Sequence, residues 1–105
     1  MIAAIVKFEL KDEVRKQLAD INVARQHIQE VVEGCRKTPG LKEKYFIMDP
    51  KTYAQGAMLI WEKQADFDAY LKSAEYKATV LDICKGKPRL EVYVHTANLT
   101  DGVLI

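Results

Sequence analysis

Cysteine is scarce in this 105-residue sequence, and the two cysteines present, Cys35 and Cys84, lie far apart. Neither belongs to a C-x-x-C pair or to a Cys/His spacing of the kind that holds zinc. The sequence therefore predicts neither a disulfide framework nor a metal site. Two buried free thiols are typical of proteins kept in a reducing compartment, so we expect a cytoplasmic protein.

The sequence also lacks long apolar runs and blocks of like charge. No stretch approaches the roughly 20 apolar residues that a membrane-spanning helix needs, so no membrane partner is predicted. The first ten residues, MIAAIVKFEL, are apolar but carry no basic leader or cleavage site, and they favour a strand over a signal peptide. With 16 Lys and Arg spread among 15 Asp and Glu, the net charge is +1, and no nucleic-acid partner is predicted.

Signature motifs of several enzyme classes are missing as well. The chain contains no P-loop, no G-x-G-x-x-G, no H-E-x-x-H and no G-x-S-x-G. Kinase, metalloprotease and hydrolase functions of those types therefore have no support. The length and the composition, 49% hydrophobic and 30% charged, indicate one globular domain over residues 1–105.

What the sequence does contain is an alternation of strand-like and helix-like hydrophobic patterns. Asp20 is a suitable N-cap that divides the first helical region, and Gly34 followed by Pro39-Gly40 marks the expected end of that region. Gly56 interrupts a strand and predicts a bulge or a close backbone approach. The predicted elements are a strand at 2–10, a helix at 11–37, strands at 41–49 and 53–62, helices at 65–73 and 73–84, and a strand at 90–98. This β-α-β-β-α-β order predicts an α+β, ferredoxin-like fold with an antiparallel sheet.

The first helical region carries an apolar stripe that predicts which face packs inward. Its members recur at spacings of three and four residues: Val14, Leu18, Ile21, Ile28, Val32 and Cys35. Arg25 occupies the same stripe, where a guanidinium must be paired or must face a cavity. His27 falls beside the stripe, and we expect its side chain to be partly exposed.

Alternation in the strands predicts their faces. The first strand is apolar on both faces at its start, which favours a sheet covered on both sides. In the second strand, Leu41 falls on the same face as Tyr45 and Ile47. The C-terminal Val103-Leu104-Ile105 is apolar enough that we expect it to dock on another surface.

Three stretches of the chain together resemble a known group of proteins. They are the turn and strand PGLKEKYFIMD, the glycine-containing strand that ends in Leu59-Ile60-Trp61-Glu62, and the helix Phe67-x-x-Tyr70-Leu71-x-Ser73. These stretches are similar to the dimeric α/β-barrel superfamily, and most similar to its YdhR-like and antibiotic-biosynthesis monooxygenases. The resemblance implies a homodimer in which two four-stranded sheets face each other and close a barrel. Helices would cover the outside, and each subunit would hold a pocket between helices and sheet.

The resemblance also implies a chemistry. Monooxygenases of this type use no metal and no flavin: a bound phenol or quinol loses a proton, and its electron-rich ring reacts directly with oxygen. We therefore expect no cofactor, and a small apolar or aromatic molecule as the partner.

Other functions of the superfamily remain open, because one fold serves many functions. The alternatives are a non-catalytic binder of a small molecule and an isomerase or lactone-handling enzyme. Haem degradation is disfavoured, because the first strand has no Asn, and Tyr70 and Tyr76 stand in the region where the second helix of those enzymes carries a His.

Six residues are candidates for such a site. Trp61 aligns with a tryptophan of many relatives and would form a pocket wall with an N–H donor, or simply fill the core. His95 can act as a catalytic base near neutral pH, although a core or interface histidine is commoner. Arg25 can stabilise a phenolate or carboxylate, or pair with a glutamate. The tyrosines expected to contact the substrate are Tyr45, Tyr70 and Tyr93.

Overall fold

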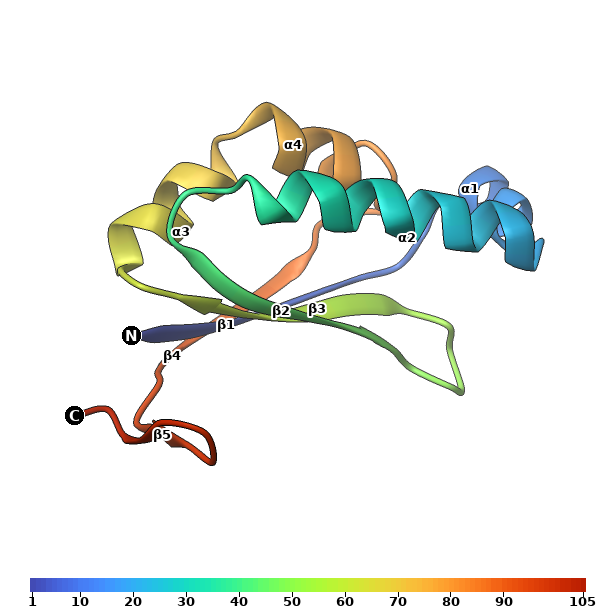
Figure 1. Cartoon of the computed structure of the whole chain (residues 1–105). Helices are drawn as coiled ribbons and strands as arrows, with labels where there is room; N and C mark the ends of the chain where they lie inside the picture. The colour runs from blue at the N-terminus through green and yellow to red at the C-terminus, as the bar shows by residue number, and fades with distance from the viewer.

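The computed structural model describes residues 1–105 and shows a layer of helices packed on one face of a sheet (Figure 1). The chain order confirms the predicted β-α-β-β-α-β pattern, to which a short C-terminal hairpin is added. The π-helical turn η1 continues α4 without a break. The elements are β1 (Ile2–Phe8), α1 (Asp12–Leu18), α2 (Ile21–Arg36), β2 (Leu41–Met48), β3 (Gln55–Trp61), α3 (Gln64–Leu71), α4 (Ala74–Tyr76), η1 (Lys77–Leu81), β4 (Arg89–Val94), β5 (Ala97–Asn98) and β6 (Gly102–Val103).

The four long strands pair in the order β2-β3-β1-β4, and each neighbouring pair is antiparallel. This order, with the helices on one side, confirms the α+β ferredoxin-like fold. Gly56 lies in β3 at the predicted close approach, because a Cβ there would be 2.8 Å from the carbonyl oxygen of Val6. No helix of the chain is long and apolar enough to cross a lipid bilayer.

The densest part of the core joins the end of β3 to α3 and α4. Trp61 is fully buried, and its ring centroid lies 5.7 Å from that of Phe67 and 5.2 Å from that of Tyr70. Tyr70 packs edge-on against Tyr76 at 5.2 Å. Burying a side chain of phenylalanine size contributes roughly 1.5–3 kcal/mol, so these four rings fasten one end of the helix layer to the sheet.

The opposite face of the sheet carries no helix (Figure 1). On that face Met58 pairs across the strands with Ile5 and with Tyr45. Met58 is 40% exposed and Tyr45 is 56% exposed. The expected cover on both faces is therefore present on only one face within a single chain.

The two cysteines, Cys35 and Cys84, are buried and free, as expected. The cytoplasmic location that they suggest stays a prediction, as does the absence of a nucleic-acid partner.

The long helix ends between Gly34 and Pro39-Gly40, as predicted, although Gly34 itself is still helical. α2 continues to Arg36, and Gly34 lies where the helix passes Glu75 of α4. A Cβ at Gly34 would lie 2.6 Å from Glu75 Oε1, so glycine permits the close approach. Thr38 Oγ1 lies 3.3 Å from the carbonyl oxygen of Gly34 and 3.2 Å from Glu75 Oε2. This contact, the Thr38–Glu75 clamp, fastens the C-terminal end of α2 to α4.

The face predicted for Leu41 was also wrong. A β-bulge between Leu41 and Glu43 places Leu41 opposite Trp61, where its side chain packs against the core. Leu41 therefore does not share a face with Tyr45 and Ile47, because one extra residue reverses the alternation of a strand.

Asp20 caps α2, as predicted. Its Oδ1 accepts hydrogen bonds from the backbone N–H groups of Asn22, at 2.8 Å, and Val23, at 3.4 Å. The cap also separates α1 from α2, so the predicted apolar stripe is divided between two helices. The inward face of α2 includes Ala24 and His27, and His27 therefore lies on the stripe and not beside it.

We expect Asp20→Ala to lower the free energy of unfolding by about 1 kcal/mol, because two backbone N–H groups lose their acceptor. Asp20→Asn is the matched control, since it keeps an oxygen at the capping position and should cost much less. Urea denaturation followed by circular dichroism measures both. Equal losses in the two variants would mean that the carboxylate charge, and not the cap, matters at this position.

Candidate functional site

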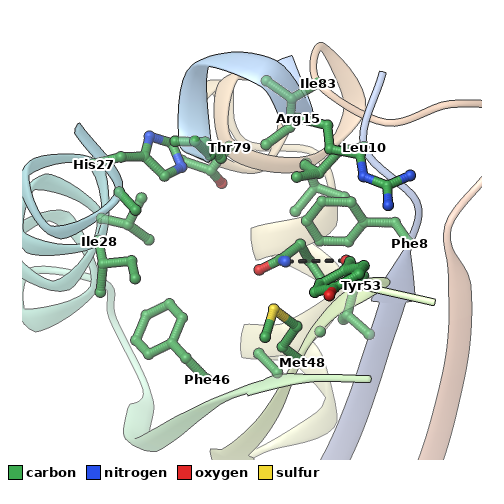
Figure 2. A pocket seen from close by; sticks show the side chains of 18 of the residues that line it. Phe8, Leu10, Arg15, His27, Ile28, Phe46, Met48, Tyr53, Thr79 and Ile83 are labelled. Atoms are coloured by element: carbon green, nitrogen blue, oxygen red, sulfur yellow. Dashed lines mark hydrogen bonds between the residues drawn. The ribbon is translucent and has the colours of Figure 1, made fainter. Parts of the chain in front are cut away.

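A cavity of about 670 Å³ lies between the helix layer and the sheet, and it reaches the aromatic cluster at Tyr70. Its volume is typical of sites for small organic molecules. It is lined by 23 residues, of which 17 are hydrophobic, and they come from α1, α2, α3, η1 and strands β1 to β3 with their flanking loops. Figure 2 shows the open space, with His27 and Ile28 on one side and Phe8, Leu10 and Tyr53 on the other.

The cavity exists because small residues face each other across the layers. Ala19 and Ala24 stand on the helix side, while Ala57 faces them from β3. Interiors are normally filled to crystal-like density, and three small side chains in facing positions leave part of that volume empty. The large rings of the core meanwhile hold the two layers apart at the other end.

Polar side chains are few among the lining residues, and they differ in exposure. They are Arg15, His27, Lys44, Tyr53, Gln55, Tyr70 and Thr79. We call the surroundings of Lys44 and Tyr70 the inner end, because Lys44 is half-buried and Tyr70 is buried. We call the exposed pair Arg15 and Tyr53 the outer rim. No cluster of three or more His, Cys, Asp or Glu side chains is arranged to bind a metal ion.

At the inner end, a lysine ammonium has only weak partners. Lys44 Nζ lies 3.3 Å from the sulfur of Cys35 and 4.9 Å from the ring centroid of Phe46. A thiol is a weak acceptor, and no carboxylate pairs with this ammonium. Burial is the main cause that raises the pKa of Tyr70, and a hydrogen bond with Thr79 acts against it. The inner end therefore offers a cation and a protonated hydroxyl group.

At the outer rim, a guanidinium lies on an aromatic ring. Arg15 Cζ is 5.2 Å from the ring centroid of Tyr53. Tyr53 has φ of 62°, and it is the one residue other than glycine with positive φ. The Asp49 turn holds it there: Asp49 Oδ1 accepts from the backbone N–H groups of Lys51 and Thr52, which lowers the pKa of Asp49.

His27 lines the cavity between these two ends. Its ring points toward Thr79 of η1 in Figure 2. The hydrogen-bonded histidine ring of the chain belongs to His95, so the imidazole of His27 has no partner within the chain. A signal for His27 is present in the sequence, because it stands three residues after Ala24 and four before Val31, which also line the cavity.

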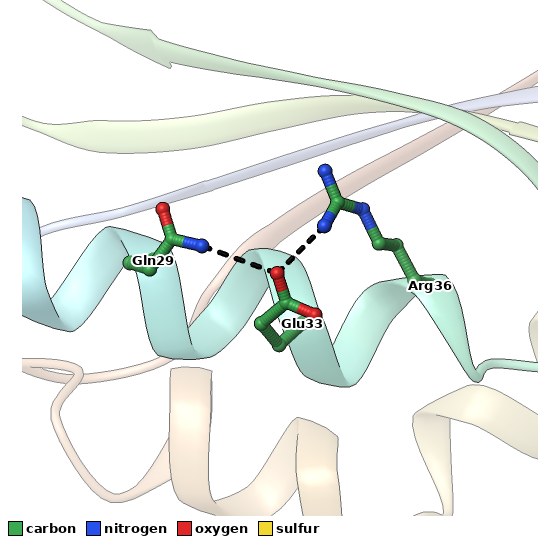
Figure 3. Close-up of polar contacts among 3 residues, drawn as sticks. All are labelled: Gln29, Glu33 and Arg36. Carbon is green, nitrogen blue, oxygen red and sulfur yellow. Dashed lines mark hydrogen bonds and ion pairs between the residues drawn. The ribbon is translucent and has the colours of Figure 1, made fainter.

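Arg25 lies on the exposed outer face of α2 and does not line the cavity. Its helical spacing places it in line with Gln29, Glu33 and Arg36. Figure 3 shows that Gln29 Nε2 donates to Glu33 Oε1 at 3.1 Å and that Arg36 pairs with the same oxygen at 2.6 Å. This polar network marks the solvent side of the helix, so the placement of Arg25 in the apolar stripe was wrong. The stripe itself is confirmed in most positions, because Leu18, Ile21 and Ile28 line the cavity and Cys35 is buried.

The other five sequence candidates are spread over four places. Tyr70 alone among them lines the cavity. Trp61 lies behind it in the core, and its Nε1 has no hydrogen-bond partner. His95 follows β4, with its Nε2 3.2 Å from Asn98 Nδ2. The remaining two, Tyr45 and Tyr93, lie on the sheet face without helices.

No protein-family model and no curated protein sequence matches the chain. Solved structures do match. Rv0793 from Mycobacterium tuberculosis is 13% identical with a TM-score of 0.67, over 94% of this chain and 98% of that one. SnoaB, described as a cofactor-independent oxygenase from Streptomyces nogalater, is 9% identical with a TM-score of 0.63, and the match covers 95% of this chain and 97% of SnoaB. A structure described as an antibiotic biosynthesis monooxygenase is 16% identical with a TM-score of 0.66, over 90% and 98%. The chain therefore has the fold that the resemblance implied.

The buried Tyr70 makes the stability of the chain depend on pH in alkaline solution. Its raised pKa means that the folded chain keeps a proton that the unfolded chain releases above pH ~10. Its contribution is fully present below that pH, and it is lost by up to about 1.4 kcal/mol per pH unit as the pH rises. We expect Tyr70→Phe to make this dependence shallower.

The measurement is the urea midpoint of wild type and Tyr70→Phe at a series of pH values from about 8 to 11. Tyr76, whose pKa burial also raises, leaves a residual slope in the variant. Tyr45→Phe is the matched control, because its ring lies on the exposed sheet face. Parallel curves for wild type and Tyr70→Phe would contradict the expectation.

Proposed function

We propose that this chain is a cofactor-independent, monooxygenase-like enzyme that acts on a small phenol or quinol held in the cavity. The observation that carries the proposal is the cavity itself: about 670 Å³, mostly apolar, with one imidazole and two cationic side chains among its lining residues. An aromatic molecule fits such a space, and a few polar groups suffice to orient it. The oxygenase structures that share the fold support the same class of reaction.

In the proposed reaction His27 removes the phenolic proton, since imidazole titrates near neutral pH. Lys44 stabilises the resulting anion, and this attraction is strong because the surroundings are apolar. Tyr70 donates a hydrogen bond from the same end. The electron-rich ring carbon opposite the phenolate then reacts with O₂: its C–H becomes C=O and the phenolate becomes the second C=O. The other oxygen atom leaves as water with the hydrogen of that carbon and the proton that His27 removed. The substrate supplies the electrons, so no external reductant enters the balance.

A non-catalytic binder is the second candidate, and the isolation of His27 favours it. A general base is usually oriented by a further group, and the His27 imidazole has no such partner within the chain. In that case the same cavity holds the molecule without turning it over. His95 and Arg25 stay alternatives as base and as anion-stabilising group, at sites outside the cavity.

The experiment compares the two histidines directly. We expect the wild type to convert anthrone to anthraquinone with O₂ uptake, measured by an oxygen electrode and by absorbance. His27→Gln should lower the rate by about 100-fold or more, the usual contribution of a general base. His95→Gln, the matched control, should keep the wild-type rate.

If the rate falls in His95→Gln alone, the catalytic base is His95, in the segment after β4. Anthrone binding without O₂ uptake would support the binder and end the oxygenase proposal. An enzyme-free reaction is run beside each sample, because anthrone also oxidises slowly in air.

The proposal includes a homodimer, formed through the sheet face that no helix covers. Apolar patches of this kind mark interaction sites, and a second sheet would cover them. The apolar tail residues Leu99, Val103 and Ile105 are also exposed, on a hairpin that projects to the same side (Figure 1). The exposed face of the sheet is made by Ala3, Ile5, Tyr45, Ile47, Met58, Ile60 and Tyr93.

We expect Met58→Glu to weaken the dimer by about 100-fold or more, because it buries an unpaired carboxylate in each half of the interface. Analytical ultracentrifugation over a range of concentrations measures this. Leu81→Glu is the matched control, since Leu81 is similarly exposed at 44% but lies on η1. A wild type that sediments as one chain, or a Met58→Glu variant that still dimerises normally, would contradict the proposal.

A further inference from the structure

The charged residues that line the cavity are all basic. Among 23 lining residues there is no Asp or Glu, although the chain contains 15 of them. Arg15 and Lys44 are the charged members, and His27 is the third titratable base. The ion pairs of the chain join other residues: Arg36–Glu33, Lys42–Glu62, Lys77–Asp82 and Lys85–Asp12. An apolar cavity that holds cations without counterions is suited to an anionic ligand.

The two cationic side chains differ in the partners that they already have within the chain. Lys44 has the Cys35 sulfur at 3.3 Å, and the proposed reaction uses it at the inner end. Arg15 touches only the face of the Tyr53 ring, with Cζ 5.2 Å from the centroid. A guanidinium that stacks on a ring keeps its N–H donors at its edge, and a planar oxyanion binds that edge with two parallel hydrogen bonds. Arg15 is therefore the cation that is available for recognition.

The unusual backbone conformation of Tyr53 indicates that the position of this residue matters for function. A bulky residue with φ of 62° is unfavourable, and such residues persist where the surroundings hold them. The Tyr53 N–H donates to the Asp49 carbonyl oxygen at 2.8 Å, and Gln55 Nε2 donates to the Tyr53 carbonyl oxygen at 3.1 Å. These bonds fix the position of the ring under Arg15, beside Phe8 at the edge of the cavity (Figure 2).

We infer that the substrate class is an aromatic molecule with a carboxylate, which Arg15 binds at the outer rim while the apolar body fills the cavity. This inference rests on the proposed function, because it takes the cavity as the substrate site. The reacting oxygen then lies at the inner end. Along β2, Lys44 and Met48 are four residues apart, about 13 Å, which matches the length of two or three fused rings. In this inference Arg15, and not Arg25, is the arginine that binds the carboxylate.

The test is a comparison of two probes of the same shape, 2-naphthoate and the neutral 2-naphthamide, by isothermal titration calorimetry. We expect wild type to bind the carboxylate about tenfold or more tightly than the amide, the effect of one good charge-assisted contact. Arg15→Gln should remove this preference and leave the affinity for the amide unchanged. Arg25→Gln is the matched control, with the same change in charge outside the cavity, and it should keep the preference.

A second pair of variants tests the ring. Tyr53→Phe should keep the preference, because the stacking face is retained, and Tyr53→Leu should reduce it. The inference is overturned if wild type binds both probes equally, or if the preference survives in Arg15→Gln. Loss of the preference in Lys44→Gln alone would place the carboxylate at the inner end and would also overturn it.

Failure of the proposed function gives a different pattern. Anthrone turnover without a carboxylate preference overturns this inference and leaves the oxygenase proposal. An Arg15-dependent preference without O₂ uptake removes the oxygenase proposal, and the inference then describes the ligand of a binder. If neither probe binds and anthrone is neither bound nor turned over, the cavity is not the site and both proposals are wrong.

Discussion

The spacing between the helix layer and the sheet is the constraint on which the rest of this structure depends. Trp61, Phe67 and Tyr70 set that spacing at one end, where three large rings are stacked between α3 and β3. The same spacing continues toward α1, but there small residues such as Ala24 and Ala57 cannot fill it. The cavity is thus a consequence of unequal side-chain volume along one layered architecture, and it needs no distortion of the fold.

The fold was predictable because its determinants are local. Periods of two and of 3.6 residues identify strands and helices wherever they occur. The start of α2 followed from a single residue, because Asp20 caps it; Ser73 caps α4 in the same way, by accepting the Tyr76 N–H at 3.1 Å. Even the close contact at Gly56 could be expected from a glycine within a strand. None of these features depends on how distant segments meet.

The site was less predictable, because it depends on orientation between segments. Alternation in a strand separates Tyr45 from Phe46, but it does not say which of them faces the helices. In the same way, helical spacing allows either the third or the fourth residue after Ile21 to face inward. The structure turns Ala24 and His27 in, and Arg25 out. Nothing in the sequence around Arg15 predicts that it lines the cavity, because its contact depends on a distant turn that places Tyr53 beneath it. A one-residue error in phase is enough to exchange one basic residue for another.

The Thr38–Glu75 clamp fastens α2 to α4 at the C-terminal end of α2 only. α2 has 16 residues and so is about 24 Å long. Its last turn is tied to α4, whereas at its first turn Ile21 is 62% exposed. A small rotation about the clamped end moves the other end several times farther, and that end borders the cavity beside α1. Amide hydrogen exchange in α2 is therefore expected to be slowest near the buried Cys35 and faster toward the exposed first turn.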